Sequence, residues 1–431
     1  MSGPQHVVLI AAFFPPWGGG GVLRMAKLAR YLPDHGWRVT VLTSDEPAPD
    51  LRDDALAGEL PAGVVVHRIR GPLNALGRPI GAAASAYRAG SAGRLVGLAK
   101  AASRALFIPD RWIGWAGRVG ALPLSDLDDP AVIVSSGPPH SAHLGARRLA
   151  ARAGIPFIAD LRDDWAGNPL HRSPAPWHGP LDARFEARTL AAAGAVTVVS
   201  EAAAAALRRR RPALAGRVLA IPNGVDLDDL DGLPPRAARA PGAPVRYLYA
   251  GSLRSPQLIG AFPAAFGRMS DPQGPPPTLT MLGNVDPVHR RALGDAIPEG
   301  RLRFLDPVEH RAALAAMADA DVLVVFTGGG GAAGGATMTG KLYEYLALRR
   351  PILLVGPPGP AAELVRSAGA GAVATPVDPA SVATALGATL ASAREPSFRG
   401  IDDARLAAFD RRAQAGRWAE LLRATVADHA D

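Results

Sequence analysis

The sequence predicts an α/β protein built from two doubly wound, Rossmann-like domains. Short apolar runs rich in Val, Ile and Leu alternate with stretches of helical length, which is typical of parallel sheets buried on both faces. The chain has 431 residues, of which 48% are hydrophobic, so it can form more than one core. Residues 226–244, rich in Pro, Gly and charge, separate two series of strands and suit a linker. We therefore expect domains over residues 1–225 and 245–398.

The apolar runs, taken in order, give seven strands and then six. In the first domain we expect strands that begin at His6, Trp37, Val64, Ala131, Pro156, Ala195 and Val218. In the second domain we expect strands that begin at Val245, Leu279, Leu302, Asp321, Ile352 and Gly371.

Two further segments have helical patterns. Residues 399–431 form a C-terminal segment that we expect to pack back on the first domain as an amphipathic helix, with an apolar face made of Leu406, Phe409, Trp418, Leu421, Leu422 and Val426. Residues 80–107 form a basic stretch that suits either a solvated helix or a helix on a membrane surface.

Composition excludes several classes of function. There is no cysteine, so disulfides, thiolate catalysis and zinc–thiolate sites are ruled out. The net charge of +8 is small for this length, and we expect no nucleic-acid partner. The apolar residues 6–14 are followed by two prolines and are not preceded by a basic segment, so we expect a strand there and not a signal peptide. We expect a cytoplasmic protein, with contact to a membrane left open.

The stretch GGATMTGKLYEYL, residues 334–346, has the spacing of a phosphate-binding P-loop. Gly335, Gly340 and Lys341 fit G-x-x-x-x-G-K, but Leu342 stands where Ser or Thr would bind Mg²⁺. The loop is also longer than a P-loop, because the preceding strand ends near Thr327. Both departures argue against a nucleoside triphosphatase.

A second glycine run, Gly18 to Gly21, follows the first strand. The pattern G-x-G-x-x-G read from Gly18 ends on Leu23, so the dinucleotide-binding fingerprint is not met. Ligands of open α/β sheets bind at the carboxyl ends of strands. Two such domains that face each other would therefore place both glycine loops on one cleft.

Five motifs, together with the first glycine loop, resemble those of GT-B glycosyltransferases of family 4. They are SSGPPHSAH (from Ser135), IADLRDDW (from Ile158), IPNGVD (from Ile221), YAGSLR (from Tyr249) and TGKLYEYLALRRPIL (from Thr339). The resemblance covers nearly the whole chain. It implies a GT-B fold and a retaining transfer of a sugar from a nucleotide diphosphate sugar, with neither a metal nor another cofactor. It also implies that the C-terminal domain binds the donor and the N-terminal domain binds the acceptor.

The resemblance implies a donor site with a cationic centre. The expected donor residues are Gly20, Gly21, Asn223, Gly251, Ser252, Arg254, Thr339, Gly340, Lys341, Leu342 and Glu344. Arg254 and Lys341 would stabilise the charge that develops on the leaving diphosphate, and Glu344 would accept hydrogen bonds from the ribose. Alternatively, Lys341 caps a helix start and Glu344 pairs with it on the surface.

The sequence departs from the family pattern at Ala336, where many relatives carry a glutamate. The donor sugar would then be held by other groups, such as the backbone N–H groups of residues 329–335. The glycine run also suits a surface lid.

On the acceptor side, the expected residues are Trp17, His140, His143, Asp160, Arg162 and Trp165. His140 and Asp163 are the candidates for assisting acceptor deprotonation. A helix-capping or core histidine is the alternative for His140, and structural ion pairs are the alternative for residues 160–165. Asp110, Arg111 and Trp112 are weaker candidates for the same surface. The spacing of the two histidines allows a metal site, which the absence of a carboxylate cluster disfavours.

These expectations favour a glycosyltransferase that acts on a small-molecule natural product, such as an antibiotic precursor, with an O- or S-linked sugar. One alternative is a cell-envelope glycosyltransferase with a lipid-linked acceptor. The others are a nucleotide-sugar epimerase and a non-catalytic partner subunit that binds the nucleotide sugar.

Overall fold

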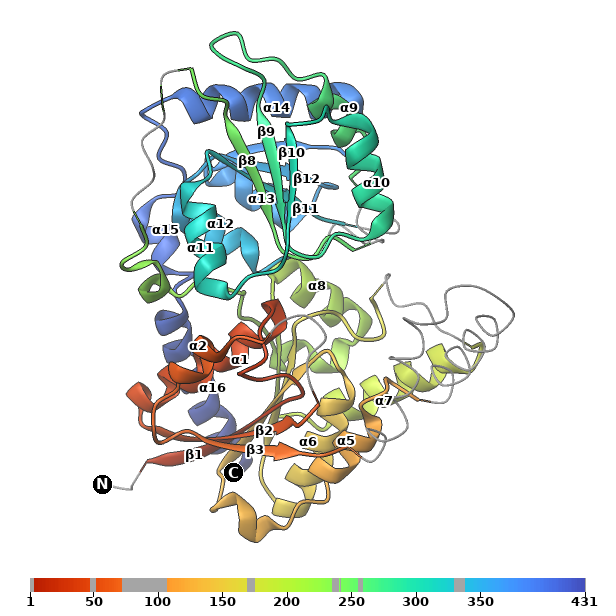
Figure 1. The fold of residues 1–431 in the computed structure, drawn as a ribbon. Helices are drawn as coiled ribbons and strands as arrows, with labels where there is room; N and C mark the ends of the chain where they lie inside the picture. The colour runs from red at the N-terminus through yellow and green to blue at the C-terminus, as the bar shows by residue number, and fades with distance from the viewer. Residues whose placement is uncertain are drawn as a thin grey trace. The chain divides into compact units, whose positions relative to one another are not determined.

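The computed structural model describes residues 4–46, 52–71, 107–168, 175–234, 240, 242–254, 259–328 and 338–430. Its contacts divide the chain into two compact units, residues 1–222 with 415–431 (unit 1) and residues 223–414 (unit 2) (Figure 1). Most of the predicted basic helix, residues 80–106, and the glycine run 329–335 with Ala336 lie outside the described residues. In the described part of the chain, none of the helices combines the length and hydrophobicity needed to cross a bilayer.

Unit 1 contains a seven-stranded parallel sheet in the order β3-β2-β1-β4-β5-β6-β7. Its strands are β1 (Gln5–Ala11), β2 (Trp37–Ser44), β3 (Val65–Ile69), β4 (Val132–Gly137), β5 (Phe157–Leu161), β6 (Ala195–Val198) and β7 (Val218–Ala220). Its helices before the C-terminal segment are α1 (Gly20–Tyr31), η1 (Leu32–His35), α2 (Asp54–Gly58), α5 (Ile113–Val119), η2 (Leu124–Leu127), α6 (Ser141–Ala153), α7 (His178–Ala191), α8 (Glu201–Arg210) and η3 (Pro212–Arg217).

Both faces of this sheet are covered, which explains the continuous apolar strands. Val7 and Leu9 of β1 point into a core with α1, whereas Val8 and Ile10 point into a core with α5 and α6. Helix α1 begins after Gly19, whose φ of 106° is accessible at little cost only to glycine. Gly19 thus ends the loop of residues 12–19, which leads from β1 into the helix.

Unit 2 contains a six-stranded parallel sheet in the order β10-β9-β8-β11-β12-β13. Its strands are β8 (Arg246–Ala250), β9 (Thr278–Leu282), β10 (Leu302–Leu305), β11 (Val322–Phe326), β12 (Ile352–Val355) and β13 (Gly371–Ala374). Its helices are η4 (Leu227–Leu230), α9 (Phe262–Gly267), α10 (Pro287–Ala296), α11 (His310–Asp319), α12 (Lys341–Leu348), α13 (Pro360–Ser367), α14 (Pro379–Arg394) and α15 (Asp403–Ala407). The predicted pair of doubly wound sheets, with seven and six strands, is confirmed.

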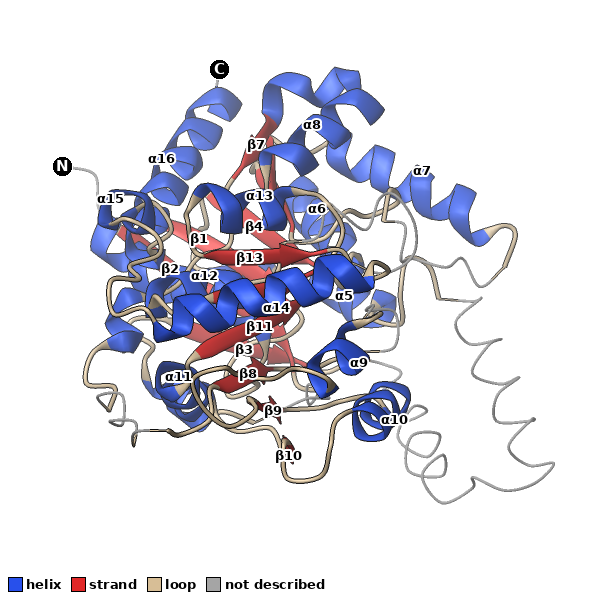
Figure 2. Cartoon of the chain, turned by 90° about the horizontal axis from the view of Figure 1, so that it is seen from above, coloured by secondary structure: helices blue, strands red, loops and turns tan. Residues whose placement is uncertain are grey.

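The second sheet is also buried on both faces. Leu248 and Leu323 pack with α11 and α12, whereas Tyr247 and Val322 pack with α9 and α14. Figure 2 shows α14 lying over β11 and β13. Such full burial needs helices on both sides, as the strand–helix alternation predicts.

The C-terminal segment is not the single helix predicted from its apolar pattern. It forms α15 and then α16 (Arg411–Ala430), with a break at residues 408–410. At the break, Phe409 packs edge-on against Tyr343 at 4.9 Å and its carbonyl accepts a hydrogen bond from Val225 N. The predicted apolar face is therefore divided: Leu406 and Phe409 contribute to unit 2, and Trp418 and Leu422 are buried in unit 1.

Strand order points to where ligands bind. In unit 1 the order reverses between β1 and β4, and in unit 2 it reverses between β8 and β11. Such switch points leave a crevice at the carboxyl ends of the two strands. In unit 1 the predicted residues Gly21 and His140 come after β1 and β4, and in unit 2 Gly251 and Lys341 come after β8 and β11.

We predict that Trp418→Ala lowers the free energy of unfolding of unit 1 by about 3 to 5 kcal/mol, because it leaves a large cavity. Trp418 is 3% exposed, and the Arg24 guanidinium lies 5.7 Å from its ring centre. Urea unfolding followed by far-UV circular dichroism measures the change. Glu420→Ala, at an exposed position of the same helix, is the control and should change stability by no more than about 0.5 kcal/mol. Equal effects of the two substitutions would show that α16 is not part of the core.

Candidate active site

Lys341 opens helix α12 in unit 2, and its side chain lies over the end of β8. Its Nζ donates a hydrogen bond to Tyr249 Oη at 3.2 Å and lies 4.5 Å from the centre of the Tyr249 ring. Among the residues that the structure describes, no carboxylate forms an ion pair with this ammonium. A partly buried cation that rests on an aromatic face is well placed to receive an anion.

Gly251 makes this arrangement possible. It follows β8 with φ at 119°, and a Cβ built there would overlap Nζ and Cε of Lys341. On the other side, Gly283 packs against the Gly251 backbone, and a Cβ at Gly283 would overlap its carbonyl. Tyr249 Oη donates to the Ser252 carbonyl at 2.8 Å, which fixes the ring beneath the ammonium. The loop after β8 is thus shaped around the Lys341 side chain.

Arg254 ends the described part of this loop. Its side chain is exposed, and its carbonyl accepts a hydrogen bond from His289 Nε2 at 3.0 Å. The backbone is therefore anchored at an exposed residue. This suits the predicted contact with phosphate, which stays a prediction.

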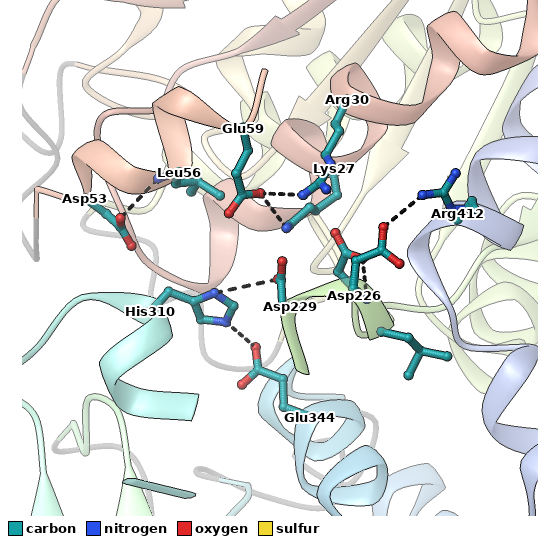
Figure 3. Close-up of polar contacts among 12 residues, drawn as sticks. Lys27, Arg30, Asp53, Leu56, Glu59, Asp226, Asp229, His310, Glu344 and Arg412 are labelled. Carbon is teal, nitrogen blue, oxygen red and sulfur yellow. Dashed lines mark hydrogen bonds and ion pairs between the residues drawn. The ribbon is translucent and has the colours of Figure 1, made fainter. Parts of the chain in front are cut away.

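Glu344 lies one turn after Lys341 and is largely buried. Its Oε1 accepts a hydrogen bond from His310 Nε2 at 3.0 Å, and His310 Nδ1 lies 3.9 Å from Asp229 Oδ2 (Figure 3). The alternative that Glu344 pairs with Lys341 is wrong, because the histidine is its partner. Glu344 Oε2 has no hydrogen-bond partner within the described ranges.

The remaining predicted donor residues contact their neighbours mainly through backbone carbonyl groups. The Thr339 and Gly340 carbonyls accept hydrogen bonds from the Leu342 and Tyr343 amides in the first turn of α12. The Leu342 side chain is fully buried in the core of unit 2 and has a packing role, and the contact of this residue with the donor stays a prediction. The Asn223 carbonyl accepts a hydrogen bond from Gln414 Nε2 at 3.2 Å.

In unit 1, Arg162 braces the loops at the switch point. Its Nη1 donates to the Gly21 carbonyl at 2.6 Å and its Nη2 donates to the Pro138 carbonyl. A Cβ at Gly21 would overlap the guanidinium, so this glycine permits the contact. Arg162 was predicted to bind the acceptor, but the structure uses both of its terminal nitrogens to hold backbone in place.

Asp160 is a structural residue and not the predicted acceptor contact. It is fully buried and accepts hydrogen bonds from Arg24 Nη2 at 2.8 Å, Ser136 Oγ at 2.8 Å and Thr197 Oγ1 at 2.7 Å. Burial alone raises the pKa of Asp160, but the Arg24 guanidinium and the hydrogen bonds outweigh it and hold the pKa below its ordinary value. This carboxylate therefore joins the ends of β4, β5 and β6 to α1.

His140, His143 and Trp165 form an aromatic cluster after β4 and β5. His140 stacks on Trp165 with ring centres 5.1 Å apart, and Trp165 Nε1 donates to Asp182 at 2.6 Å. His143 is fully buried beside Ser135 Oγ at 2.8 Å, and burial lowers its pKa to about 4. The burial of His143 and Trp165 replaces their predicted contact with an acceptor by a role in holding His140, which is 9% exposed.

Asp163 and Trp17 are the more accessible residues of the predicted acceptor set. Asp163 is exposed. Desolvation by the surrounding protein raises its pKa above the ordinary value, and this effect outweighs the Arg162 charge, which lowers the pKa. Trp17 is half-buried, and the Arg52 guanidinium lies 5.9 Å from its ring centre. Asp163 is thus ionisable, reachable and more basic than a typical aspartate.

Two further residues show contacts that the sequence did not predict. The Asp110 carboxylate accepts hydrogen bonds from the Ser141 amide at 3.0 Å and the Ser141 hydroxyl at 2.7 Å, and so caps helix α6 directly after His140. The weak prediction that Asp110 lines the site becomes a structural role. His310 was not singled out at all, because nothing in its local sequence marks it as a partner of Glu344.

Comparisons with known proteins identify a domain and the fold. Residues 19–224 match the family model described as a glycosyl transferase 4-like domain, whereas a comparison with curated proteins finds no match. Among solved structures, sucrose-phosphate synthase from Thermosynechococcus elongatus has a TM-score of 0.66 at 18% identity, covering 98% of this chain and 100% of that one.

Two other solved structures are similar over nearly their whole lengths. Trehalose-phosphate synthase (UDP-forming) from Burkholderia xenovorans, solved with glucose-6-phosphate, has a TM-score of 0.64 at 13% identity and covers 97% of this chain and 100% of that one. Anabaena HepE, solved with UDP-glucose, has a TM-score of 0.59 at 14% identity and covers 99% and 98%. The structural matches show that the chain has the GT-B fold, and the family model identifies residues 19–224 as a glycosyl transferase 4-like domain.

Proposed function

We propose that this protein is a retaining, metal-independent glycosyltransferase, and that it transfers a sugar from a nucleotide diphosphate sugar to a small-molecule acceptor. The observation that carries the proposal is the Lys341 ammonium, which rests on Tyr249 and has no carboxylate partner in the described parts of the chain. A diphosphate would supply the missing negative charge, and the exposed Arg254 would supply a second cation.

Glu344 would bind the nucleoside end of the same donor. Its Oε2 is available to accept hydrogen bonds from ribose hydroxyls, and it lies on the helix that Lys341 opens. A UDP-linked hexose is our first choice of donor. The complex of HepE with UDP-glucose and the UDP-forming trehalose-phosphate synthase support this choice.

The reaction would proceed on one face of the donor sugar. The bond from the anomeric carbon to the diphosphate oxygen breaks, and a bond from the same carbon to the acceptor oxygen or sulfur forms on the same side. The acceptor proton passes to the leaving phosphate, and Asp163 and His140 assist this deprotonation. Lys341 and Arg254 would stabilise the charge that grows on that phosphate, which favours the transition state over the ground state.

On the acceptor side, we propose that Asp163 and His140 hydrogen bond to the attacking group. Asp163 is exposed, and His140 stacks on Trp165 with 9% of its surface exposed. A natural-product hydroxyl or thiol, as in an antibiotic precursor, is our preferred acceptor. The trehalose-phosphate synthase solved with glucose-6-phosphate makes a sugar phosphate the first alternative.

A thermal-shift screen against UDP-, GDP-, ADP- and dTDP-sugars tests the donor. A ligand present at about 100 times its Kd should stabilise the folded protein by about 2.7 kcal/mol and raise its Tm. We expect one nucleotide class to do so with and without EDTA. If none of the four nucleotide sugars raises the Tm, the protein has no donor site of this kind. Acceptor-dependent release of the nucleoside diphosphate then separates transfer from epimerisation and from binding alone.

Substitution of Asp163 and His140 tests the acceptor side. We expect Asp163→Asn and His140→Ala each to lower kcat by at least about 10²-fold, the lower end of general-base effects, with little change in donor affinity. As the pH is lowered, protonation of Asp163 should reduce kcat/KM. Because the pKa of Asp163 is raised, this loss should begin at a higher pH than it would for an ordinary aspartate. The Asp163→Asn variant should not show this pH-dependent loss. Asp126→Asn, at an exposed position in unit 1, is the control. Near-full transfer by both variants would refute the assignment.

A further inference from the structure

A chain of three side chains in unit 2 ends at Glu344. Glu344 comes from helix α12, His310 is the first residue of helix α11, and Asp229 belongs to the short helix η4. His310 Nε2 and Glu344 Oε1 are 3.0 Å apart, and His310 Nδ1 and Asp229 Oδ2 are 3.9 Å apart (Figure 3). The exposed fractions of the His310, Glu344 and Asp229 side chains are 21%, 11% and 10%. The imidazole is thus set between two largely buried carboxylates.

This contact restricts how the Glu344 carboxylate can turn. A free carboxylate rotates about its last bond and presents either oxygen, since such terminal torsions are broad. With Oε1 held by His310, only Oε2 is left to meet a ligand, and its direction is set by the ring. The ring itself is held between the two carboxylates, because each of its nitrogens faces one of them. Such preorganisation reduces the entropy that a ligand must remove on binding.

We propose that His310 is a positioning residue for the donor: it orients Glu344 so that Oε2 accepts hydrogen bonds from the ribose hydroxyls, and it thereby selects ribonucleotide donors. The inference rests on the proposed function, in which Glu344 meets the ribose. His310 acts through Glu344 and does not touch the donor. A histidine that only ties α11 to α12 would support all ligands of the site equally.

The test compares the binding of UDP and of 2′,3′-dideoxy-UDP by calorimetry. A hydrogen bond to a charged group contributes about 1.5 to 3 kcal/mol. We therefore expect the wild-type protein to bind UDP about ten to a hundred times more tightly than the dideoxy compound. Glu344→Ala should reduce this ratio nearly to one, and His310→Ala should reduce it to about threefold or less.

Two variants of similar size to each other distinguish a loss of Glu344 orientation from a loss of the fold. In His310→Gln the amide nitrogen takes the place of Nε2 and can still donate to Glu344, so the ratio should stay close to that of the wild type. In His310→Asn the amide takes the place of Nδ1 and does not reach Glu344, so the ratio should fall as in His310→Ala. In transfer assays His310→Asn should raise the donor KM and leave kcat nearly unchanged. Thermal melting of both variants shows whether the fold is retained.

The outcomes are distinct. If His310→Asn and His310→Ala keep the wild-type ratio while Glu344→Ala loses it, the role of His310 is refuted and the donor site stands. If Glu344→Ala also keeps the ratio, Glu344 does not meet the ribose, and both that part of the proposed function and the role of His310 are refuted. A loss of the ratio in His310→Asn with rescue in His310→Gln supports the inference.

Discussion

The placement of one ammonium group organises the candidate donor site. A cation held away from bulk water loses hydration energy that its surroundings must replace. The Tyr249 ring and hydroxyl replace part of it for Lys341, and within the described ranges no carboxylate replaces the rest. The arrangement persists because Gly251 leaves room for the side chain and because the helix beneath it is fixed. Tyr345 contributes to that fixation: its hydroxyl accepts a hydrogen bond from the Ala250 amide at 3.1 Å, directly before Gly251. A rigid, uncompensated charge is what a diphosphate requires from its site.

In unit 1, burial separates the residues that hold the site from those that can react. Asp160, Ser136, Thr197 and Arg24 satisfy one another in a fully enclosed network, where a charge is tolerated only because it is paired. Only three positions later the chain is at the surface, where the Asp163 carboxyl is accessible and has a raised pKa. One short segment after a single strand therefore provides both an anchor and a candidate reactive group.

Much of the fold could be predicted because it follows from local patterns. The apolar strands, their alternation with helices and the turns made by the glycine loops depend on residues that are close in sequence. The break before α16 could not be predicted, since Phe409 leaves the helical pattern to pack on Tyr343, far away in the sequence.

The same limit applies to the site. Motif residues could be grouped at the strand ends, but the sequence does not show which of them would be enclosed. Asp160 and Trp165 look as suitable for binding as Asp163 until Arg24 and Asp182 are seen to occupy them. His310 was missed for the converse reason, because its link to Glu344 joins two helices that are separated in the sequence by β11 and residues 327–340.

The most direct test of the donor site is the affinity of the protein for UDP and for uridine, with and without the Lys341 charge. Lys341→Met keeps an unbranched side chain of similar length and removes the ammonium. We predict that the substitution weakens UDP binding by about 1.5 to 3 kcal/mol, which is roughly tenfold to a hundredfold, and leaves uridine binding unchanged. UDP affinity that is the same in the wild type and in Lys341→Met would contradict the account, because Lys341 would then not meet the diphosphate.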